Sequence, residues 1–292
     1  MEVGEQYSAF AVDGEFRQSS GEIVPWWSFT KTLIASLCLR LQEAGALDLN
    51  EPLPNADYSL RQLLNHSAGV PSYTGLLDYH EAVARRDDPW PYQEVLRRSG
   101  ATNGSRHEGP WCYSNTGYAI ARDALERATH TSLAELASNY LFQPLGLSSV
   151  RIAQKPEDLR NCRWLSDAGY HPGWVYHGLA IGTPDDAARF LDWLTAGNSI
   201  SLSSWSELTT AITVGGPVPG RPWRTAAYGL GVMCGEMEGV GSVIGHSGNG
   251  GFSVCAIYSA MRDGRRLTAA CFSGHDDEAI PEWAVQRLLT LS

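Results

Sequence analysis

The sequence predicts an α+β fold in which one antiparallel sheet is built from both ends of the chain and flanked by helices. Three observations support this: short β-rich segments at the start, a long middle part with helical patterning, and more β-rich segments after about residue 225. Strands that follow one another on tight turns pair in antiparallel fashion. We expect a sheet domain from residues 1–55 and 200–292, an all-helical insert over residues 56–199, and a functional site in the cleft between them.

The first part of the chain is expected to form a hairpin and then a helix. The apolar residues 7–12, the turn signal Asp13-Gly14 and a return segment predict a hairpin over residues 7–19. After Pro25, apolar side chains recur at the spacing of one helix face until Gly45 ends the pattern. The side chains on this face are Leu33, Ile34, Leu37 and Leu41.

Helical patterning dominates from there to about residue 200. Ser59, Ser132 and Thr183 each precede a helical pattern and can accept a hydrogen bond from its first turn. Pro184 suits the first position of a helix. The predicted helices cover residues 59–64, 116–127, 133–142 and 184–194, and the predicted surface loops cover residues 161–174 and 215–222.

The last part of the chain is predicted to be a meander of strands on short turns, closed by one helix. The predicted strands cover residues 228–236, 241–245, 252–260 and 267–273, and the helix covers residues 279–289.

The cysteines indicate free thiols and no metal centre. No Cys-x-x-Cys pair occurs, and His171 and His177 have no obvious third ligand, so we expect neither a metal nor a cofactor. The Asp263-Gly264 turn places Cys255 and Cys271 on neighbouring strands, offset by about one residue, which sends their side chains to opposite faces of the sheet. The other cysteines are Cys38, Cys112, Cys162 and Cys234.

Composition excludes several classes of protein. Apolar residues make up 43% of the 292 residues and charged residues 18%, which is ordinary for a globular chain with a core. The net charge of −10 without a basic run argues against nucleic acid or an anionic membrane surface as partner. No stretch approaches the roughly 20 apolar residues of a membrane span. The acidic N-terminus predicts no secretory signal, hence a cytoplasmic protein, or a periplasmic one if the chain has been trimmed.

Ser28 and Lys31 are the first candidates for chemistry, because a spacing of three puts them on one face at the start of a helix. The serine then occupies the electropositive helix end. A serine hydroxyl needs a nearby base, and a partly buried lysine can lose its proton because desolvation disfavours the ammonium form. Lys155 is the only other lysine, so a lysine in an apolar helix favours a catalytic pair over the alternative of a solvated first-turn side chain.

Tyr113 and Asn115 form a second candidate pair. Two residues apart in an extended loop, their side chains can point the same way. The phenol could relay protons while the amide holds a substrate amide.

The glycine-rich residues 245–251 end a predicted strand and leave backbone N–H groups exposed. The segment also begins like the nucleophile elbow Gly-x-Ser-x-Gly around Ser247. However, Asn249 replaces the last glycine, and the predicted context is an antiparallel meander rather than strand–turn–helix.

Three short motifs therefore occur in one order along the chain. They are Ser28-x-x-Lys31, Tyr113-x-Asn115 and His246-x-Gly248. Together they resemble the motifs of the penicillin-recognising serine hydrolases, and most of all those of the class C β-lactamase-related group. The resemblance covers nearly the whole chain and includes residues 63–71 (with Ala68 where serine is usual), 144–147, 182–183 and 228–231.

The resemblance implies a β-lactamase/transpeptidase-like fold and a serine hydrolase. Ser28 would attack a carbonyl to form an acyl-enzyme, Lys31 and Tyr113 would share the role of base, and His246 would belong to the catalytic set. The resemblance implies no metal and no cofactor.

The same resemblance implies where the substrate is held. Asn115 would bind the substrate, and the backbone N–H groups of Ser28 and of Asn249, just after Gly248, would form the oxyanion hole. Such donors typically contribute on the order of 10² to 10³ in rate.

Two departures from the family pattern bear on the expected substrate. Few residues precede Ser28, so the N-terminal helix usual in these proteins is expected to be missing or very short. His246 stands where class C β-lactamases have lysine, as is typical of the related D-aminopeptidases, D-amino-acid amidases, DD-peptidases and some esterases. We therefore expect hydrolysis of a small amide or ester, such as a D-amino-acid amide, a peptide or a small ester.

Three alternatives remain beside this prediction. The same site could act as a genuine β-lactamase or DD-peptidase. An α/β-hydrolase-type esterase could use Ser247 with His275. A binding protein or sensor on the same fold could accept an acyl group without turning over.

The loop after the last strand is expected to approach the cleft, as the resemblance implies. It carries Asp276, Asp277 and Glu278 and no basic residue, so a mouth without fixed positive charge would favour a free amine or a neutral ester over a β-lactam. The alternative is that these acids cap the last helix. The tryptophans near the motifs either line an acyl pocket or belong to the core. They are Trp26, Trp27 and Trp111.

Overall fold

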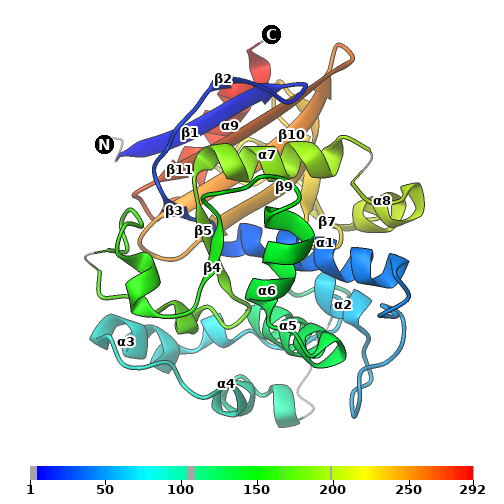
Figure 1. Ribbon diagram of the computed structural model, residues 1–292, viewed down its shortest axis with the longest axis vertical. Coiled ribbons are helices and arrows are strands. Elements are labelled where there is room, and N and C mark those ends of the chain that lie inside the picture. The colour runs from blue at the N-terminus through cyan, green and yellow to red at the C-terminus, as the bar shows by residue number, and fades with distance from the viewer. Residues whose placement is uncertain (1–4, 104–108, 167, 198, 292) are drawn as a thin grey trace.

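The computed structural model describes residues 5–103, 109–166, 168–197 and 199–291. It confirms the α+β prediction, because both ends of the chain contribute to one antiparallel sheet of eight strands (Figure 1). The strand order is β2-β1-β11-β10-β9-β8-β7-β6. The strands are β1 (Gln6–Val12), β2 (Glu15–Gln18), β6 (Ile212–Gly215), β7 (Trp223–Tyr228), β8 (Met233–Met237), β9 (Gly241–Asn249), β10 (Val254–Arg262) and β11 (Arg265–Ser273).

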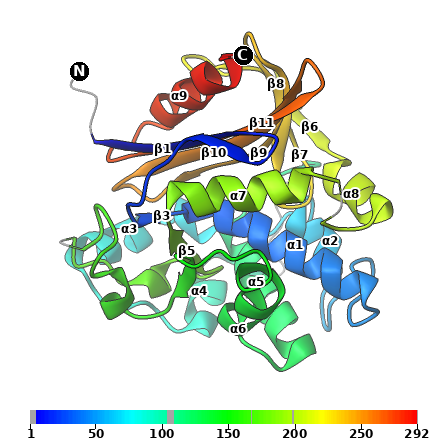
Figure 2. The same ribbon diagram turned by 45° about the horizontal axis from the view of Figure 1, so that its top comes forward.

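Helices cover both faces of the sheet (Figure 2). On one face α9 (Ala279–Thr290) packs on β10 and β11, and on the other α7 (Pro184–Thr195) packs on β1, β10 and β11. The Thr183 hydroxyl accepts a hydrogen bond from the Asp186 N–H at 3.2 Å, as expected of a residue that starts a helix. The predicted hairpin and both helices are confirmed.

The first helix, α1 (Thr30–Glu43), is buried along most of its length and packs against the helices of the middle part of the chain. It ends before Gly45, whose φ of +71° suits glycine. No helix within the described ranges is long and apolar enough to cross a membrane. The other helices are α2 (Leu60–Leu64), α3 (Leu77–Arg85), α4 (Tyr92–Arg98), α5 (Asn115–Thr129), α6 (Leu133–Ala137), which a π turn extends over Ser138–Phe142, and α8 (Leu202–Thr209).

The structure corrects the prediction that the insert is all-helical. A second sheet joins β3 (Val24–Pro25), β5 (Leu179–Gly182) and β4 (Arg151–Ala153) in the order β3-β5-β4. Strands of two to four residues are too short to show an alternating pattern.

A second correction concerns the strand predicted over residues 228–236. The chain turns between β7 and β8 at residues 229–232, where Leu230 and Val232 are buried. The apolar pattern therefore continues through a turn. In the other direction, β9 runs four residues beyond the predicted end at residue 245, to Asn249.

The register between β10 and β11 confirms the prediction for the two cysteines. Cys255 lies opposite Phe272, and Cys271 lies opposite Ala256, so the offset is one residue. Cys255 belongs to the core on the α1 side, Cys271 to the core under α9, and both thiols are free.

The turn between β7 and β8 is wedged against α1 at Gly231. Its φ is +68°, its N–H donates to the Leu64 carbonyl, and a Cβ there would lie 2.6 Å from the Ala35 Cβ. A side chain at this position would meet both backbone strain and a packed helix.

We expect Gly231→Ala to lower the free energy of unfolding by about 2–4 kcal/mol, because overpacking adds to the strain of a positive φ. Gly264→Ala is the matched control: its φ is +77° with no atom within 4 Å, so only the strain remains, about 1 kcal/mol. Urea unfolding measures both variants. Equal losses would contradict the claim that contact with α1 fixes this turn.

Candidate active site

Ser28 lies in a 3₁₀ turn (Trp27–Phe29) between β3 and α1. The residue before it, Trp27, has a φ of +42°, which is a strained conformation for a bulky side chain. The Trp27 indole donates a hydrogen bond to the Ser253 hydroxyl at 2.9 Å, and a Cβ at Gly250 would lie 2.2 Å from its ring. Packing of this ring against the glycine-rich end of β9 therefore holds the turn that presents Ser28.

Lys31 is fully buried, and its amine touches three polar atoms. Its Nζ lies 2.9 Å from Ser28 Oγ, 2.7 Å from Asn115 Oδ1 and 3.3 Å from His177 Nε2. Burial lowers the pKa of Lys31 well below its usual value. The structure therefore brings the two side chains into contact, as the spacing of three predicted.

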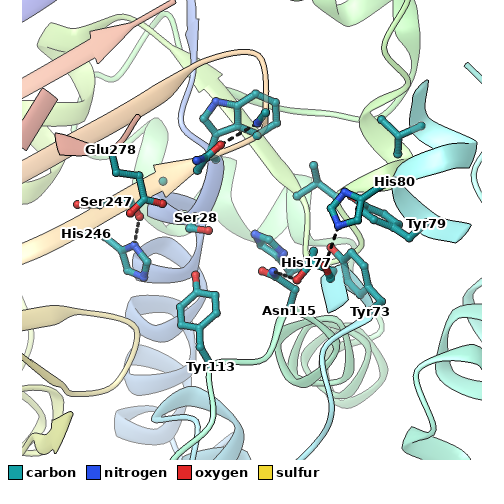
Figure 3. A pocket seen from close by; sticks show the side chains of 18 of the residues that line it. Ser28, Tyr73, Tyr79, His80, Tyr113, Asn115, His177, His246, Ser247 and Glu278 are labelled. Atoms are coloured by element: carbon teal, nitrogen blue, oxygen red, sulfur yellow. Dashed lines mark hydrogen bonds between the residues drawn. The ribbon is translucent and has the colours of Figure 1, made fainter. Parts of the chain in front are cut away.

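Tyr113 points its hydroxyl toward Ser28 in the cleft (Figure 3). Its ring lies 5.0 Å from Lys31 Nζ, and Ser28 is a hydrogen-bond partner of the phenol. Burial raises the pKa of Tyr113, and the Glu278 carboxylate raises it further although the Ser28 contact opposes both. The phenol is therefore protonated at neutral pH, which suits a proton relay better than a phenolate base.

His246 lines the same cleft from β9 but contacts other groups than Ser28. Its Nε2 lies 2.8 Å from the Tyr228 hydroxyl, and its Nδ1 is close to the Ser247 carbonyl. Burial, and then the nearby Lys31, lower the pKa of His246 to about 3. The imidazole is thus neutral, so it cannot replace the positive charge of a lysine.

The end of β9 runs directly against the serine turn. A Cβ at Gly248 would lie 2.8 Å from the Ser28 nitrogen. The pairing of β8 with β9 begins at Met233 and Gly245, and beyond it the Ser247 N–H donates to Met233 Sδ. Strand alternation places the Asn249 N–H on the same open edge. The Ser28 nitrogen therefore lies beside Gly248, and Asn249 is the next residue along the strand.

The cleft has a volume of about 570 Å³ and two chemically different ends. An aromatic wall lies on the side of α3, where Figure 3 shows Tyr73, Tyr79 and His80. Arg221 and Glu278 line the other end. Trp27 and Trp111 line the cleft as well, whereas Trp26 belongs to the core.

The acidic loop differs from the expectation in its details. Only Glu278 of the three acids lines the cleft, because Asp277 accepts a hydrogen bond from the Ala279 N–H at 2.9 Å and so caps α9. Asp276 is exposed and touches His275. The helix-capping alternative therefore holds for Asp277.

The expectation of a mouth without fixed positive charge is wrong, because Arg221 lies there. Its Nη1 is 2.7 Å from Glu278 Oε2, and its Nε is 2.6 Å from an oxygen of the buried Glu282. Arg221 comes from the predicted loop over residues 215–222, far in sequence from every motif. No local pattern marks it.

The elbow alternative around Ser247 is wrong in this structure. Ser247 lies within an antiparallel strand, and its hydroxyl contacts Glu282 and, at 2.8 Å, the Tyr258 hydroxyl. The His275 ring instead contacts Asp276 and the Asp277 N–H. Ser247 and His275 therefore do not form a nucleophile–base pair.

His177 is a second residue at this site, after Arg221, that the sequence analysis missed. It was weighed there only as a metal ligand together with His171, whose Nδ1 accepts a hydrogen bond from the Gly173 N–H. Within the described part of the chain, no three His, Cys, Asp or Glu side chains are grouped as they would be to hold a metal ion. His177 precedes β5 and turns inward to Lys31, a contact between residues 146 positions apart.

Comparison with known proteins points to one family. A family model described as Beta-lactamase matches residues 12–277. The chain is 23% identical over 265 residues to the D-alanyl-D-alanine-carboxypeptidase/endopeptidase AmpH of Escherichia coli (strain K12), which covers 80% of this chain and 66% of that protein. It is 27% identical over 175 residues to Penicillin-binding protein 4* of Bacillus subtilis (strain 168), covering 54% and 36%. The chain thus spans about one third to two thirds of these relatives.

Solved structures support the same fold. The D-amino acid amidase from Ochrobactrum anthropi SV3 superimposes with a TM-score of 0.77 at 24% identity, covering 99% of this chain and 94% of that one. The octameric penicillin-binding protein homologue from Pyrococcus abyssi gives 0.77 at 20% identity, covering 99% and 74%. These likenesses confirm the predicted β-lactamase/transpeptidase-like fold.

We expect the protein to lose stability as the pH falls from about 6.5 toward 3, because burial lowers the pKa values of His66, His177 and His246 in the native state. Below pH 6.5 the unfolded chain binds protons that the native protein does not, so the free energy of unfolding falls by about 1.4 kcal/mol per pH unit for each such histidine. Denaturant unfolding at several pH values measures the slope. His246→Gln should reduce the slope of the unfolding free energy against pH by the contribution of one proton. An unchanged slope would contradict the claim that the pKa of His246 is lowered in the native state.

Proposed function

Because the chain belongs to the beta-lactamase family, we propose that it is a serine hydrolase that cleaves amide or ester bonds through an acyl-enzyme on Ser28. The observation that carries the proposal is the buried Lys31 amine 2.9 Å from the Ser28 hydroxyl. The Lys31 amine is buried, and in the described part of the chain no carboxylate contacts it. Such a setting favours the neutral amine, the form that can take a proton.

In the proposed acylation, the Ser28 oxygen attacks the substrate carbonyl while its proton moves to the Lys31 amine. The phenol of Tyr113, which touches Ser28, gives its proton to the leaving amine or alkoxide and regains one from the Lys31 ammonium. Water then attacks the acyl-enzyme carbonyl and gives a proton to Lys31. As the bond from the acyl group to the Ser28 oxygen breaks, Lys31 returns the proton to that oxygen, so that Ser28 and the neutral amine are both restored. Lys31 is the base in this proposal because burial, and then the Glu278 carboxylate, raise the pKa of Tyr113 and so disfavour its phenolate.

The proposed oxyanion hole consists of the Ser28 and Asn249 N–H groups. Gly248 makes their approach possible, since any side chain there would collide with the serine turn. Asn249 is itself held by its side chain, which donates to the Asp276 carbonyl at 2.9 Å and accepts from the Gly251 N–H. Asn115 bonds to Lys31 and lines the cleft, where its amide can also meet the substrate.

The charge at the cleft end favours a substrate with a free ammonium group. Glu282 accepts two hydrogen bonds from Arg221, and Glu278 is paired with the same guanidinium. This cluster of one guanidinium and two carboxylates carries one net negative charge. Glu278 is the member that lines the cleft beside Arg221. We infer an amide or short peptide of a D-amino acid with its amine free, which is also the chemistry that the names of a D-aminopeptidase and a D-amino acid amidase among the similar proteins describe.

Hydrolysis of a β-lactam or of a D-alanyl-D-alanine peptide at the same serine is the second candidate. Arg221 favours it, because a guanidinium at the cleft could bind a substrate carboxylate. The three Arg221 nitrogens, however, are already engaged by Glu278 and Glu282. The third candidate function is that of a sensor that keeps its acyl group. A permanent adduct in a mass spectrum would identify it.

We expect Ser28→Ala and Lys31→Met each to lower kcat by about 10³-fold or more on every substrate, because members of one catalytic unit do not contribute independently. Mass spectrometry after mixing with p-nitrophenyl acetate should show an acyl adduct on the unaltered protein and none on Ser28→Ala. Ser247→Ala serves as the control and should still form the adduct, and EDTA should change nothing. Full turnover by Ser28→Ala would overturn the proposed function.

We expect Glu278→Gln to raise KM for a D-amino-acid amide about tenfold, because the substrate ammonium loses a charged partner. The KM for neutral p-nitrophenyl acetate should stay nearly constant, and turnover of a chromogenic cephalosporin should rise as Arg221 is freed. Asp276→Asn, which removes an exposed charge outside the cleft, is the matched control. A loss equal for cationic and neutral substrates would contradict a charge-specific role.

A further inference from the structure

We propose that His177 is a positioning residue for Lys31: its neutral imidazole accepts a hydrogen bond from the Lys31 amine through Nε2 and so directs the lone pair of that amine at the Ser28 hydroxyl. The inference deepens the proposed function and rests on the roles given there to Ser28 and Lys31. The proposed positioning role belongs to a side chain, His177, that lies outside the three sequence motifs.

The contact is made between two buried groups. His177 is 3% exposed, Lys31 is fully buried, and the two nitrogens lie 3.3 Å apart. His177 also lines the cleft. A polar contact in this setting is not exchanged for water, so its direction matters more than it would at the surface.

Counting protons and lone pairs gives that direction. A neutral lysine amine has two N–H donors and one lone pair. The Asn115 side-chain oxygen at 2.7 Å is an acceptor and takes the first donor. If His177 Nε2 takes the second, the lone pair is left for the Ser28 hydroxyl at 2.9 Å. If His177 instead donated from Nε2, it would occupy the lone pair that Ser28 requires.

This arrangement fixes the tautomer of His177. Nε2 must be unprotonated to accept, so the ring proton is on Nδ1. Within the described residues, Nδ1 has no hydrogen-bond partner although it is buried. Among the residues that the structure describes, no group at Nδ1 competes with Lys31 in orienting the ring, and the hydrogen bond to the amine is made by Nε2.

The small sheet explains how His177 is held at this distance. Directly after it, β5 pairs with β3, which leads into the serine turn. The Trp26 N–H donates to the Ala180 carbonyl at 2.9 Å, and the Ala180 N–H donates to the Thr30 hydroxyl at 3.0 Å. The segments that carry His177 and Ser28 are therefore bonded to each other immediately beside the two residues.

Other titratable groups also act on this pair and enter any pH dependence. The rings of Tyr113 and Tyr118 lie 5.0 and 5.5 Å from Lys31 Nζ. Arg122 and two further buried imidazoles also act on the charge of His177, and the same two imidazoles interact with Lys31. The buried imidazoles are His66 and His246.

The test compares two substitutions of nearly equal shape. His177→Gln places an amide oxygen near the Nε2 position and keeps an acceptor, whereas His177→Met removes it. With p-nitrophenyl acetate in stopped flow, we expect His177→Met to slow acylation about 10- to 100-fold and His177→Gln to recover most of that loss. Equal rates in the two variants would overturn the proposal.

The pH profile separates positioning from a purely structural role. An ammonium donates to three acceptors and an amine to two, so loss of one acceptor disfavours the ammonium and lowers the pKa of Lys31. In the pH profile of the acylation rate, the acid limb is the range in which the rate falls as Lys31 becomes protonated. This limb should therefore move to lower pH, by about half a unit or more, in His177→Met and not in His177→Gln. A limb at the same pH in both variants would contradict the proposal.

Nitrogen NMR with ¹⁵N-labelled histidine tests the contact without measuring activity. We expect His177 to carry its proton on Nδ1, as His246 does beside the Ser247 carbonyl, and we expect the His177 Nε2 shift to change in Lys31→Met. An Nε2–H tautomer would overturn the proposal. Turnover by Ser28→Ala would instead refute the proposed function and leave this result standing, so the two failures are distinguishable.

Discussion

The site depends on one constraint: Lys31 is buried, and none of the carboxylates in the described part of the chain pairs with it. A lysine amine in such a place costs free energy if it is charged, so it sheds its proton and becomes a base. Everything near Lys31 is consistent with this: its contacts are a hydroxyl, an amide oxygen and an imidazole, and its ring neighbours are phenols. Lys31 is buried between the two sheets, α1 and α5. The strained turn at Trp27 places the Ser28 hydroxyl beside the Lys31 amine.

The carboxylates of the site are kept at a distance from that amine. Glu278 and Glu282 are bound by Arg221 at the other side of the cleft, and Asp277 is used by the helix that follows. A carboxylate in contact with Lys31 would restore the ammonium form and stop the proton transfer. The separation of negative charge from the lysine therefore suits both the proposed proton transfer and the proposed binding of a substrate ammonium group.

Much of this could be predicted from the sequence because the signals are local. The hairpin at Asp13-Gly14, the cap at Thr183 and the pairing of Ser28 with Lys31 each depend on residues a few positions apart. Arg221 and His177 could not be predicted, since each reaches the cleft from a segment whose sequence has no pattern of its own. The turn at residues 229–232 was missed for the opposite reason, because buried Leu230 and Val232 imitate a strand.

The main sheet has a consequence for how the protein is made. β1 leaves the ribosome well before its partner β11, and the two pair along seven residues. Ser28, the proposed nucleophile, likewise precedes β9 by more than 200 residues. Long-range pairing of this kind is slow and comes after local helices have formed. A nascent chain that has not yet reached β9 therefore holds Ser28 and Lys31 without the strand that completes the cleft, and the proposed reactivity begins only after β9 has been synthesised.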